Sequence, residues 1–148
     1  MWSADDGPFH GKHFQLAETL CSPAPVSSPR PRIMIGGGGE RKTLRLVAQY
    51  ADACNFFGPP DMVGHKVDVL RRHCDAVGRD IRDIEVSAFA GVGERGTADD
   101  VLRSAERLAS LGVATVMAGA VGPDPASALE TVFGPAMERL AALQPTPL

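Results

Sequence analysis

Four consecutive glycines, at positions 36–39, separate a short apolar run from the start of a helical pattern. Residues without a Cβ let backbone N–H groups turn inward and approach an anion, and a helix that begins there adds unpaired N–H groups and a partial positive charge. Arg41 and Lys42 add charge, and the Thr43 hydroxyl can donate to a phosphate oxygen if it faces the turn. The sequence therefore predicts a phosphate-binding turn formed by Gly36, Gly37, Gly38, Gly39, Arg41 and Thr43.

Two familiar nucleotide-binding motifs do not fit this turn. A Walker A loop needs a glycine directly before its Lys-Ser/Thr pair, and Arg41 stands there instead. The dinucleotide pattern G-x-G-x-x-G begins correctly at Gly36 but also meets Arg41 where its last glycine belongs. A plain flexible turn is the remaining alternative. It is disfavoured because each glycine costs about 0.5 to 1 kcal/mol of conformational entropy.

Other polar residues carry weaker signals. Asn55, at the end of a predicted strand, either contacts substrate or cofactor at the mouth of a barrel or is a structural polar residue. His10 and His13 have no carboxylate or cysteine pair nearby, which favours solvated loop residues over metal ligands. No metal site, disulfide or catalytic residue is predicted. His65 and His73 are expected to be surface residues, and Glu94 and Arg95 a solvated loop pair. The three cysteines are expected to be small core residues: Cys21, Cys54 and Cys74.

The elements that position the turn follow from the spacing of apolar residues. Residues 1–32 are rich in Gly and Pro and are predicted to be irregular, with a short hairpin at 9–16. Residues 33–148 predict four strand–helix units, with strands at 33–35, 53–57, 84–90 and 113–118. Thr97 with Asp100 and Asp124 with Pro125 mark two helix starts. The predicted core stripes of the four helices are Leu44, Val47, Ala48 and Ala51; Val63, Val67, Leu70, Cys74 and Val77; Val101, Ala105, Leu108 and Leu111; and Leu129, Val132, Phe133, Ala136, Leu140 and Leu143.

Four consecutive units of this kind predict an α/β fold with a parallel sheet and right-handed crossovers. Two architectures fit this pattern. One is an open sheet with helices on both faces, and the other is half of a (β/α)8 TIM barrel, which normally needs about 250 residues. The chain has 148 residues, so it is too short for a whole barrel.

Charge and hydropathy exclude two classes of partner. The net charge is −3, and the 15 Lys and Arg residues are mixed with 18 Asp and Glu, so the basic stripe of a nucleic-acid binder is missing. No stretch reaches the roughly 18 apolar residues of a membrane span, and residues 1–11 do not read as a secretory leader. We therefore expect a cytoplasmic protein that binds neither nucleic acid nor membrane.

The glycine run, its continuation ERKTLRLVA at 40–48 and YADACN at 50–55 closely resemble the luciferase-like monooxygenase superfamily, particularly its coenzyme F420-dependent oxidoreductase branch. PRIMI at 31–35, VGRD at 77–80, and Trp2-Ser3, Gly7-Pro8-Phe9 and Gly11-Lys12 near the start extend the resemblance over nearly the whole chain. The resemblance implies a barrel that binds a flavin or deazaflavin at its C-terminal mouth. Such a barrel passes a hydride to or from a substrate carbon, or activates oxygen.

On this resemblance the chain is the C-terminal half of such a barrel, and its glycine turn holds the phosphate of F420, with FMN as the alternative. Barrel phosphate sites most often follow strands seven and eight, whereas this turn would follow the fifth. The cofactor ring and small-molecule substrate would lie on an N-terminal half, so we expect the fragment alone to be inactive. Its unpaired edge strands predict a homo-oligomer or a complementing N-terminal half-barrel. The rival interpretation is a non-catalytic α/β binding module for a phosphorylated ligand.

Overall fold

The computed structural model describes residue 2 and residues 5–90, 96–120 and 123–148. The chain divides into two compact units, Met1–Arg32 and Ile33–Leu148. In the first unit, strands β1 (Phe9–His10) and β2 (Gln15–Leu16) form an antiparallel hairpin. The hairpin predicted at residues 9–16 is therefore confirmed. The predicted loop pair, Glu94 and Arg95, lies outside the described residues.

The second unit alternates parallel strands with helices. Its first three pairs are β3 (Met34–Gly36) with α1 (Thr43–Tyr50), β4 (Ala53–Phe56) with α2 (Pro60–Val77), and β5 (Glu85–Ala90) with α3 (Ala98–Ser110). A 3-10 turn, η1 (Ile81–Asp83), precedes β5. The last strand, β6 (Thr115–Ala118), is followed by a helical segment composed of α4 (Pro125–Ala128), a π-helical turn η2 (Leu129–Phe133), a 3-10 turn η3 (Gly134–Ala136) and α5 (Met137–Ala142).

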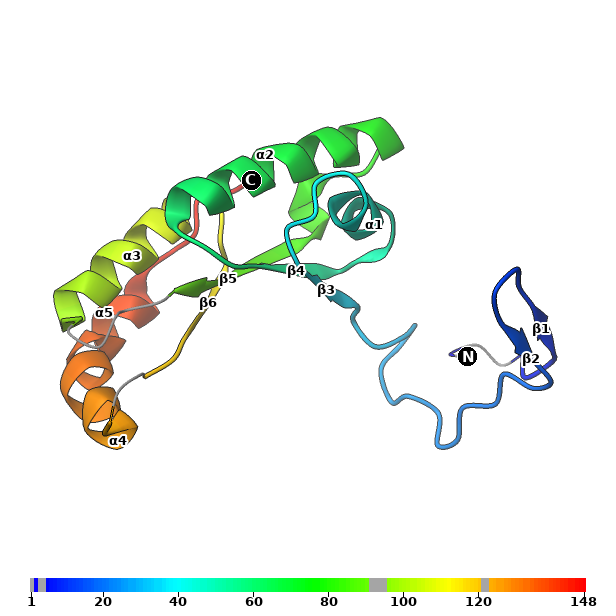
Figure 1. Ribbon diagram of the computed structural model, residues 1–148, viewed down its shortest axis with the longest axis horizontal. Helices are drawn as coiled ribbons and strands as arrows, with labels where there is room; N and C mark the ends of the chain where they lie inside the picture. The colour runs from blue at the N-terminus through cyan, green and yellow to red at the C-terminus, as the bar shows by residue number, and fades with distance from the viewer. Residues whose placement is uncertain (1, 3–4, 91–95, 121–122) are drawn as a thin grey trace. The chain divides into compact units, whose positions relative to one another are not determined.

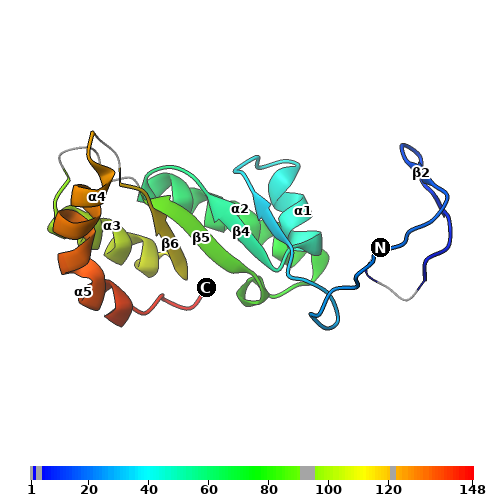
Figure 2. The same ribbon diagram turned by 90° about the horizontal axis from the view of Figure 1, so that it is seen from below.

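The four strands lie in the order β3-β4-β5-β6, so each strand pairs with the next one along the chain. Figure 1 shows α1, α2 and α3 along one face of this sheet. The view from below shows the opposite face, on which the described part of this unit places no helix (Figure 2). An open sheet with helices on both faces requires a reversal of strand order, which is missing here. The prediction of four consecutive βα units of a half-barrel is therefore confirmed, and the open-sheet alternative is wrong.

Side chains alternate between the two faces of the sheet. Cys54 and Phe56 of β4, and Val86 and Ala88 of β5, belong to the buried core beneath the helices. Because successive strand residues point to opposite sides, the residues between them point away from the helices. We call this side the helix-free face; it carries the side chains of Ala53, Asn55, Glu85, Ser87, Phe89, Thr115 and Met117.

Several helix ends are fixed as the sequence predicts. The Thr97 hydroxyl accepts a hydrogen bond from the Asp100 amide (3.2 Å), and the Asp100 carboxylate accepts one from the Thr97 amide (2.8 Å), which completes a capping box. Gly78 ends α2 in the left-handed conformation, with φ of 68°. Asp124 caps α4 by accepting from the Ser127 amide, and Pro125 follows at the first helical position.

The fourth predicted helix is wrong as a single regular element. Pro135 cannot donate a backbone hydrogen bond, and its ring would clash with the carbonyl four residues earlier in a regular α-helix. The chain responds with a π-helical turn, in which the Gly134 amide donates to the Leu129 carbonyl five residues back. Of the predicted stripe, Ala136 is fully buried and Leu129 is 53% exposed. The broken axis therefore prevents one straight apolar face.

Candidate functional site

The glycine turn begins where β3 leaves the sheet. Gly36 is the last residue of β3 and pairs with Asn55 of β4. The Gly37 amide then donates to the Asn55 carbonyl (3.1 Å), so this amide is used by the sheet. Gly37 adopts φ of 111°, a conformation that residues with a Cβ rarely take. The chain can therefore turn sharply out of the sheet only with glycine at position 37.

The next amides are not used in this way. Within the described chain, no residue accepts a hydrogen bond from the amides of Gly38, Gly39 or Glu40. The Gly39 carbonyl instead accepts from the Leu44 amide (3.0 Å), at the start of α1. Lys42 precedes this helix without capping it through its side chain. The turn and the helix start thus present backbone donors that a bound anion can use.

Close packing explains why the turn has no side chains at its centre. A Cβ placed on Gly39 would lie 2.7 Å from Oγ1 of Thr43, nearer than real Cβ atoms come to any heavy atom. A Cβ on Gly38 would lie 3.2 Å from Cε of Lys66, a tight contact. A Cβ on Gly36 would have nothing within 4 Å. The Thr43 hydroxyl therefore lies beside the turn, as phosphate binding requires, whereas glycine is not sterically required at position 36.

Helix α1 begins later than predicted. The helix starts at Thr43, and residues 40–42 form a turn before it. Thr43 lies beside Gly37 and Gly39 in this turn, and Gly38 lies beside Lys66. Arg41 is exposed, and no hydrogen bond or ion pair joins it to another described residue. The structure therefore supplies no contact that directs Arg41 toward the glycines.

Three side chains of α2 hold Glu40, the residue that follows the glycines. The sequence did not assign any of them to the site. Lys66 Nζ lies 2.5 Å from Glu40 Oε1, and His65 Nε2 lies 3.1 Å from the same oxygen. His73 Nε2 lies 2.7 Å from the Glu40 carbonyl oxygen. The hydrogen bond from Lys66 is the largest cause that lowers the pKa of Glu40, and desolvation opposes it. Both histidines were predicted to be surface residues, yet His73 is only partly exposed.

On the helix-free face, Asn55 is part of a small polar network. Its Nδ2 donates to Ser87 Oγ (3.0 Å), and Ser87 Oγ donates to the Cys54 carbonyl (2.9 Å). Asn55 is only 6% exposed and Ser87 is fully buried. The interpretation of Asn55 as a structural polar residue therefore has direct support. Contact of Asn55 with a cofactor or substrate stays a prediction.

A pair of aromatic rings lies beside this network, at the carboxyl ends of β4 and β5. The rings of Phe57 and Phe89 stack with centroids 5.2 Å apart and an interplanar angle of 10°. Their exposed fractions, 61% and 42%, are large for phenylalanine. Neither residue stands out in the sequence, because a single phenylalanine belongs to no functional motif. Together they form an exposed apolar patch at the edge where barrel enzymes bind ligands.

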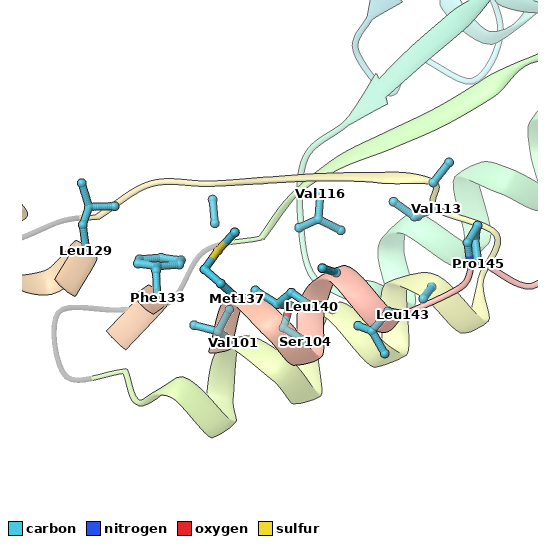
Figure 3. A pocket seen from close by; sticks show the side chains of 15 residues that line it. Val101, Ser104, Val113, Val116, Leu129, Phe133, Met137, Leu140, Leu143 and Pro145 are labelled. Atoms are coloured by element: carbon cyan, nitrogen blue, oxygen red, sulfur yellow. The ribbon is translucent and has the colours of Figure 1, made fainter. Parts of the chain in front are cut away.

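An apolar groove of about 500 Å³ lies on the other side of β6, between this strand, α3 and the C-terminal helical segment. Figure 3 shows Val116, Met137 and Leu140 among the side chains around it. Ser104 is the one lining residue with a polar side chain. The groove therefore offers no acid–base pair and no charge, and it does not qualify as a site for chemistry.

The described residues show neither a metal-binding cluster nor a membrane-spanning helix. They contain no group of three or more His, Cys, Asp or Glu side chains that could hold a metal ion. Among the helices that the structure describes, none has both the length and the apolar character needed to cross a bilayer.

Comparison with known proteins gives the site a context. The family model described as luciferase-like monooxygenase matches residues 1–142. The fold is similar to that of an F420-dependent secondary alcohol dehydrogenase solved with an F420-acetone adduct, with a TM-score of 0.77 and 13% identity over 94% of this chain and 57% of that one. It is also similar to the coenzyme F420-dependent tetrahydromethanopterin reductase from Methanopyrus kandleri (TM-score 0.67, 15% identity, 88% and 58% covered).

A third similar structure is the monooxygenase RslO1 from Streptomyces bottropensis, with a TM-score of 0.68 and 14% identity. The match covers 95% of this chain and 57% of that protein. The chain thus spans less than three fifths of the length of each of these structures. At such low identity these structural similarities show the fold alone. The chain has the fold of part of a barrel enzyme.

Proposed function

This chain belongs to the luciferase-like monooxygenase family, and from that membership we propose that it is the part of an oxidoreductase barrel that binds the phosphate of coenzyme F420. FMN is the alternative cofactor. Two of the similar structures are described as F420-dependent enzymes, which favours the deazaflavin. When bound, such a cofactor supplies a ring that accepts or donates a hydride. The chain's own contribution is to bind and orient the cofactor's tail.

The observation that carries this proposal is the close contact at Gly39. A Cβ there would lie 2.7 Å from Thr43 Oγ1, so the bare backbone is needed for the hydroxyl to lie beside the turn. Free amides of Gly38, Gly39 and Glu40 and one hydroxyl form a donor set that suits a phosphate group. The residues present therefore fit the cofactor's phosphate.

The proposal also covers the βα units that would complete the barrel. The helix-free face of the sheet is the side that faces the interior in a closed barrel. We propose that four further βα units complete the barrel, supplied by an N-terminal half or by a second copy of this chain. Those units would carry the ring and much of the pocket for a small-molecule substrate, so this chain alone is expected to be inactive. A cytoplasmic location is part of the same proposal.

Calorimetric titration of the 148-residue chain tests the cofactor proposal. F420, FMN, riboflavin and inorganic phosphate are titrated in turn, and we expect F420 to bind more tightly than FMN, and FMN more tightly than riboflavin. Gly39→Ala should weaken binding of the phosphorylated ligands at least tenfold, because its Cβ would displace Thr43. Equal weak binding of every phosphate would favour a non-catalytic binding module. No preference for FMN over riboflavin and no binding of F420 would contradict phosphate binding at the turn.

A further inference from the structure

The glycine turn has a cation beside it that comes from a different element. Lys66 lies in the second turn of α2, and its side chain is only 18% exposed. Its stem packs over Gly38, with Cε 3.2 Å from the position that a Cβ would take. A Cβ on residue 38 would therefore press against this lysine and require its stem to shift by a few tenths of an ångström. The turn and α2 together bring a positive charge to the glycines.

The ammonium group of Lys66 is held in place by one acceptor and keeps further N–H donors for a ligand. An ammonium has three N–H donors. Among the described residues, Glu40 Oε1 is the acceptor for this group, at 2.5 Å. Glu40 is itself held by His65 through the same oxygen and by His73 through its carbonyl. The remaining donors of Lys66 are therefore positioned next to the turn, and a ligand would not have to order a long flexible side chain.

The other basic residues near the turn are placed differently. Arg41 and Lys42 are exposed and belong to the turn before α1. Neither has a hydrogen bond or ion pair that fixes its side chain within the described chain. Each would lose side-chain entropy on binding an anion, whereas Lys66 has already lost most of it. Of these three basic residues, Lys66 is the one whose side chain is already held next to the turn.

Resting on the proposed binding of a phosphate at the glycine turn, we propose that Lys66 donates a charge-assisted hydrogen bond to that phosphate. The amides of Gly38 and Gly39 would bind one side of the group and the ammonium another. The same ammonium would lie between the phosphate and the carboxylate of Glu40, which reduces the repulsion between the two negative groups. Lys66 then makes the turn selective for a charged phosphate over a neutral ligand of similar shape.

The test compares each cofactor with a counterpart that lacks the phosphate: FMN with riboflavin, and F420 with its deazaflavin truncated before the phosphate. The ratio of the two affinities isolates the phosphate contact from ring binding and from general effects on folding. We expect Lys66→Met to lower this ratio by about tenfold to a hundredfold, the range for losing a hydrogen bond to a charged group. Affinity for the ligands without phosphate should stay the same.

Two variants complete the experiment. Lys66→Arg keeps the charge and should keep most of the preference for the phosphorylated ligand. Arg72→Met removes one positive charge from an exposed position on the same helix and should leave the ratio unchanged. A ratio that falls equally in Arg72→Met and Lys66→Met would reduce the effect to net charge and overturn the proposal.

The outcomes also separate this inference from the proposed function. If the unmodified chain prefers phosphorylated ligands and Lys66→Met preserves that preference, the role of Lys66 is wrong and phosphate binding at the turn survives. If the unmodified chain shows no preference for either phosphorylated cofactor, phosphate binding itself is wrong, and the role of Lys66 fails with it.

Discussion

The four glycines of the turn serve different purposes. Gly37 is required by its backbone conformation, with φ of 111°. Gly39 is required by the nearness of Thr43, whereas a Cβ on Gly38 would make a tight contact with the flexible side chain of Lys66. Gly36 has a conformation and surroundings that accept a Cβ. The four glycines thus comprise one position fixed by backbone conformation, one fixed by steric contact, one in tight contact with a flexible side chain and one that is replaceable.

These differences predict unequal effects on stability. Gly37→Ala should lower the free energy of unfolding by about 1 to 3 kcal/mol, the cost of holding a non-glycine residue in a disfavoured conformation. Gly36→Ala should change it by less than about 0.5 kcal/mol, as for an ordinary exposed position. Thermal and urea unfolding of both variants measures the difference. Equal losses in the two variants would mean that the turn is not held in this conformation in solution.

At this scale the sequence predicted the part of the site that is local in the chain. The glycines and Thr43 lie within eight consecutive residues, so composition and spacing sufficed. Lys66 and His73 were missed because their relation to Glu40 depends on how α2 packs against α1. One signal was present: the two residues are seven apart, which places them on the same side of a helix, off its apolar stripe. Nothing in the sequence shows what that side faces.

The start of α3 illustrates how one element depends on a titrating group. The hydrogen bond from the Thr97 hydroxyl is the largest cause that lowers the pKa of Asp100, and the hydrogen bond from the Thr97 amide is the second. A carboxyl with a lowered pKa in the folded state stabilises the fold above its unfolded pKa. That contribution is lost as the pH falls through the folded value. The capping box should therefore stabilise α3 at neutral pH and fail in acid.

Replacing either member of the box tests this expectation. Thr97→Ala should lower the free energy of unfolding by about 1 kcal/mol at pH 7. Asp100→Asn keeps the shape but removes the carboxylate, so it should be less stable than the unmodified chain at pH 7. Its disadvantage should shrink as the pH falls below the usual range of aspartate. A constant difference from pH 7 to pH 2, measured by chemical unfolding, would contradict a role for the ionised carboxyl.

Helix and strand positions followed from periodicity, but the width of the buried helix faces did not. In α2 the predicted Val63, Val67, Leu70 and Cys74 are buried, as is Val69, which lies off the stripe. The helix packs against α1 and α3 and shares a core with strands β4 and β5, so more than one line of residues is covered. Val77, predicted to be buried, is 42% exposed at the end of the helix. A stripe drawn from sequence assumes one packing partner, and α2 has several.

At the scale of the whole unit, the sheet has two kinds of incomplete surface. Strands β3 and β6 each have one neighbour among the described strands, so each leaves one edge unpaired. The helix-free face ends in the exposed rings of Phe57 and Phe89. Unpaired edges and exposed apolar groups both promote association with other chains.

We therefore predict that the isolated chain self-associates at micromolar concentrations. Phe89→Glu should shift the equilibrium toward monomer, because it places a charge in the apolar patch of the helix-free face. Val77→Glu is the matched control, since Val77 has the same exposed fraction, 42%, but lies in the helix layer. Sedimentation velocity over a range of concentrations measures both. A stable monomer at all concentrations would contradict the prediction.

The strand order also has a consequence for how the molecule is made. Met34 pairs with Ala53, Ala53 with Glu85, and Ser87 with Thr115, so every strand meets its partner one unit later in the chain. Pairing between near neighbours in sequence keeps the entropy of loop closure low. As the polypeptide leaves the ribosome, each new strand can join a sheet that is already there. Within this unit, no strand depends on a partner from the unit's far end.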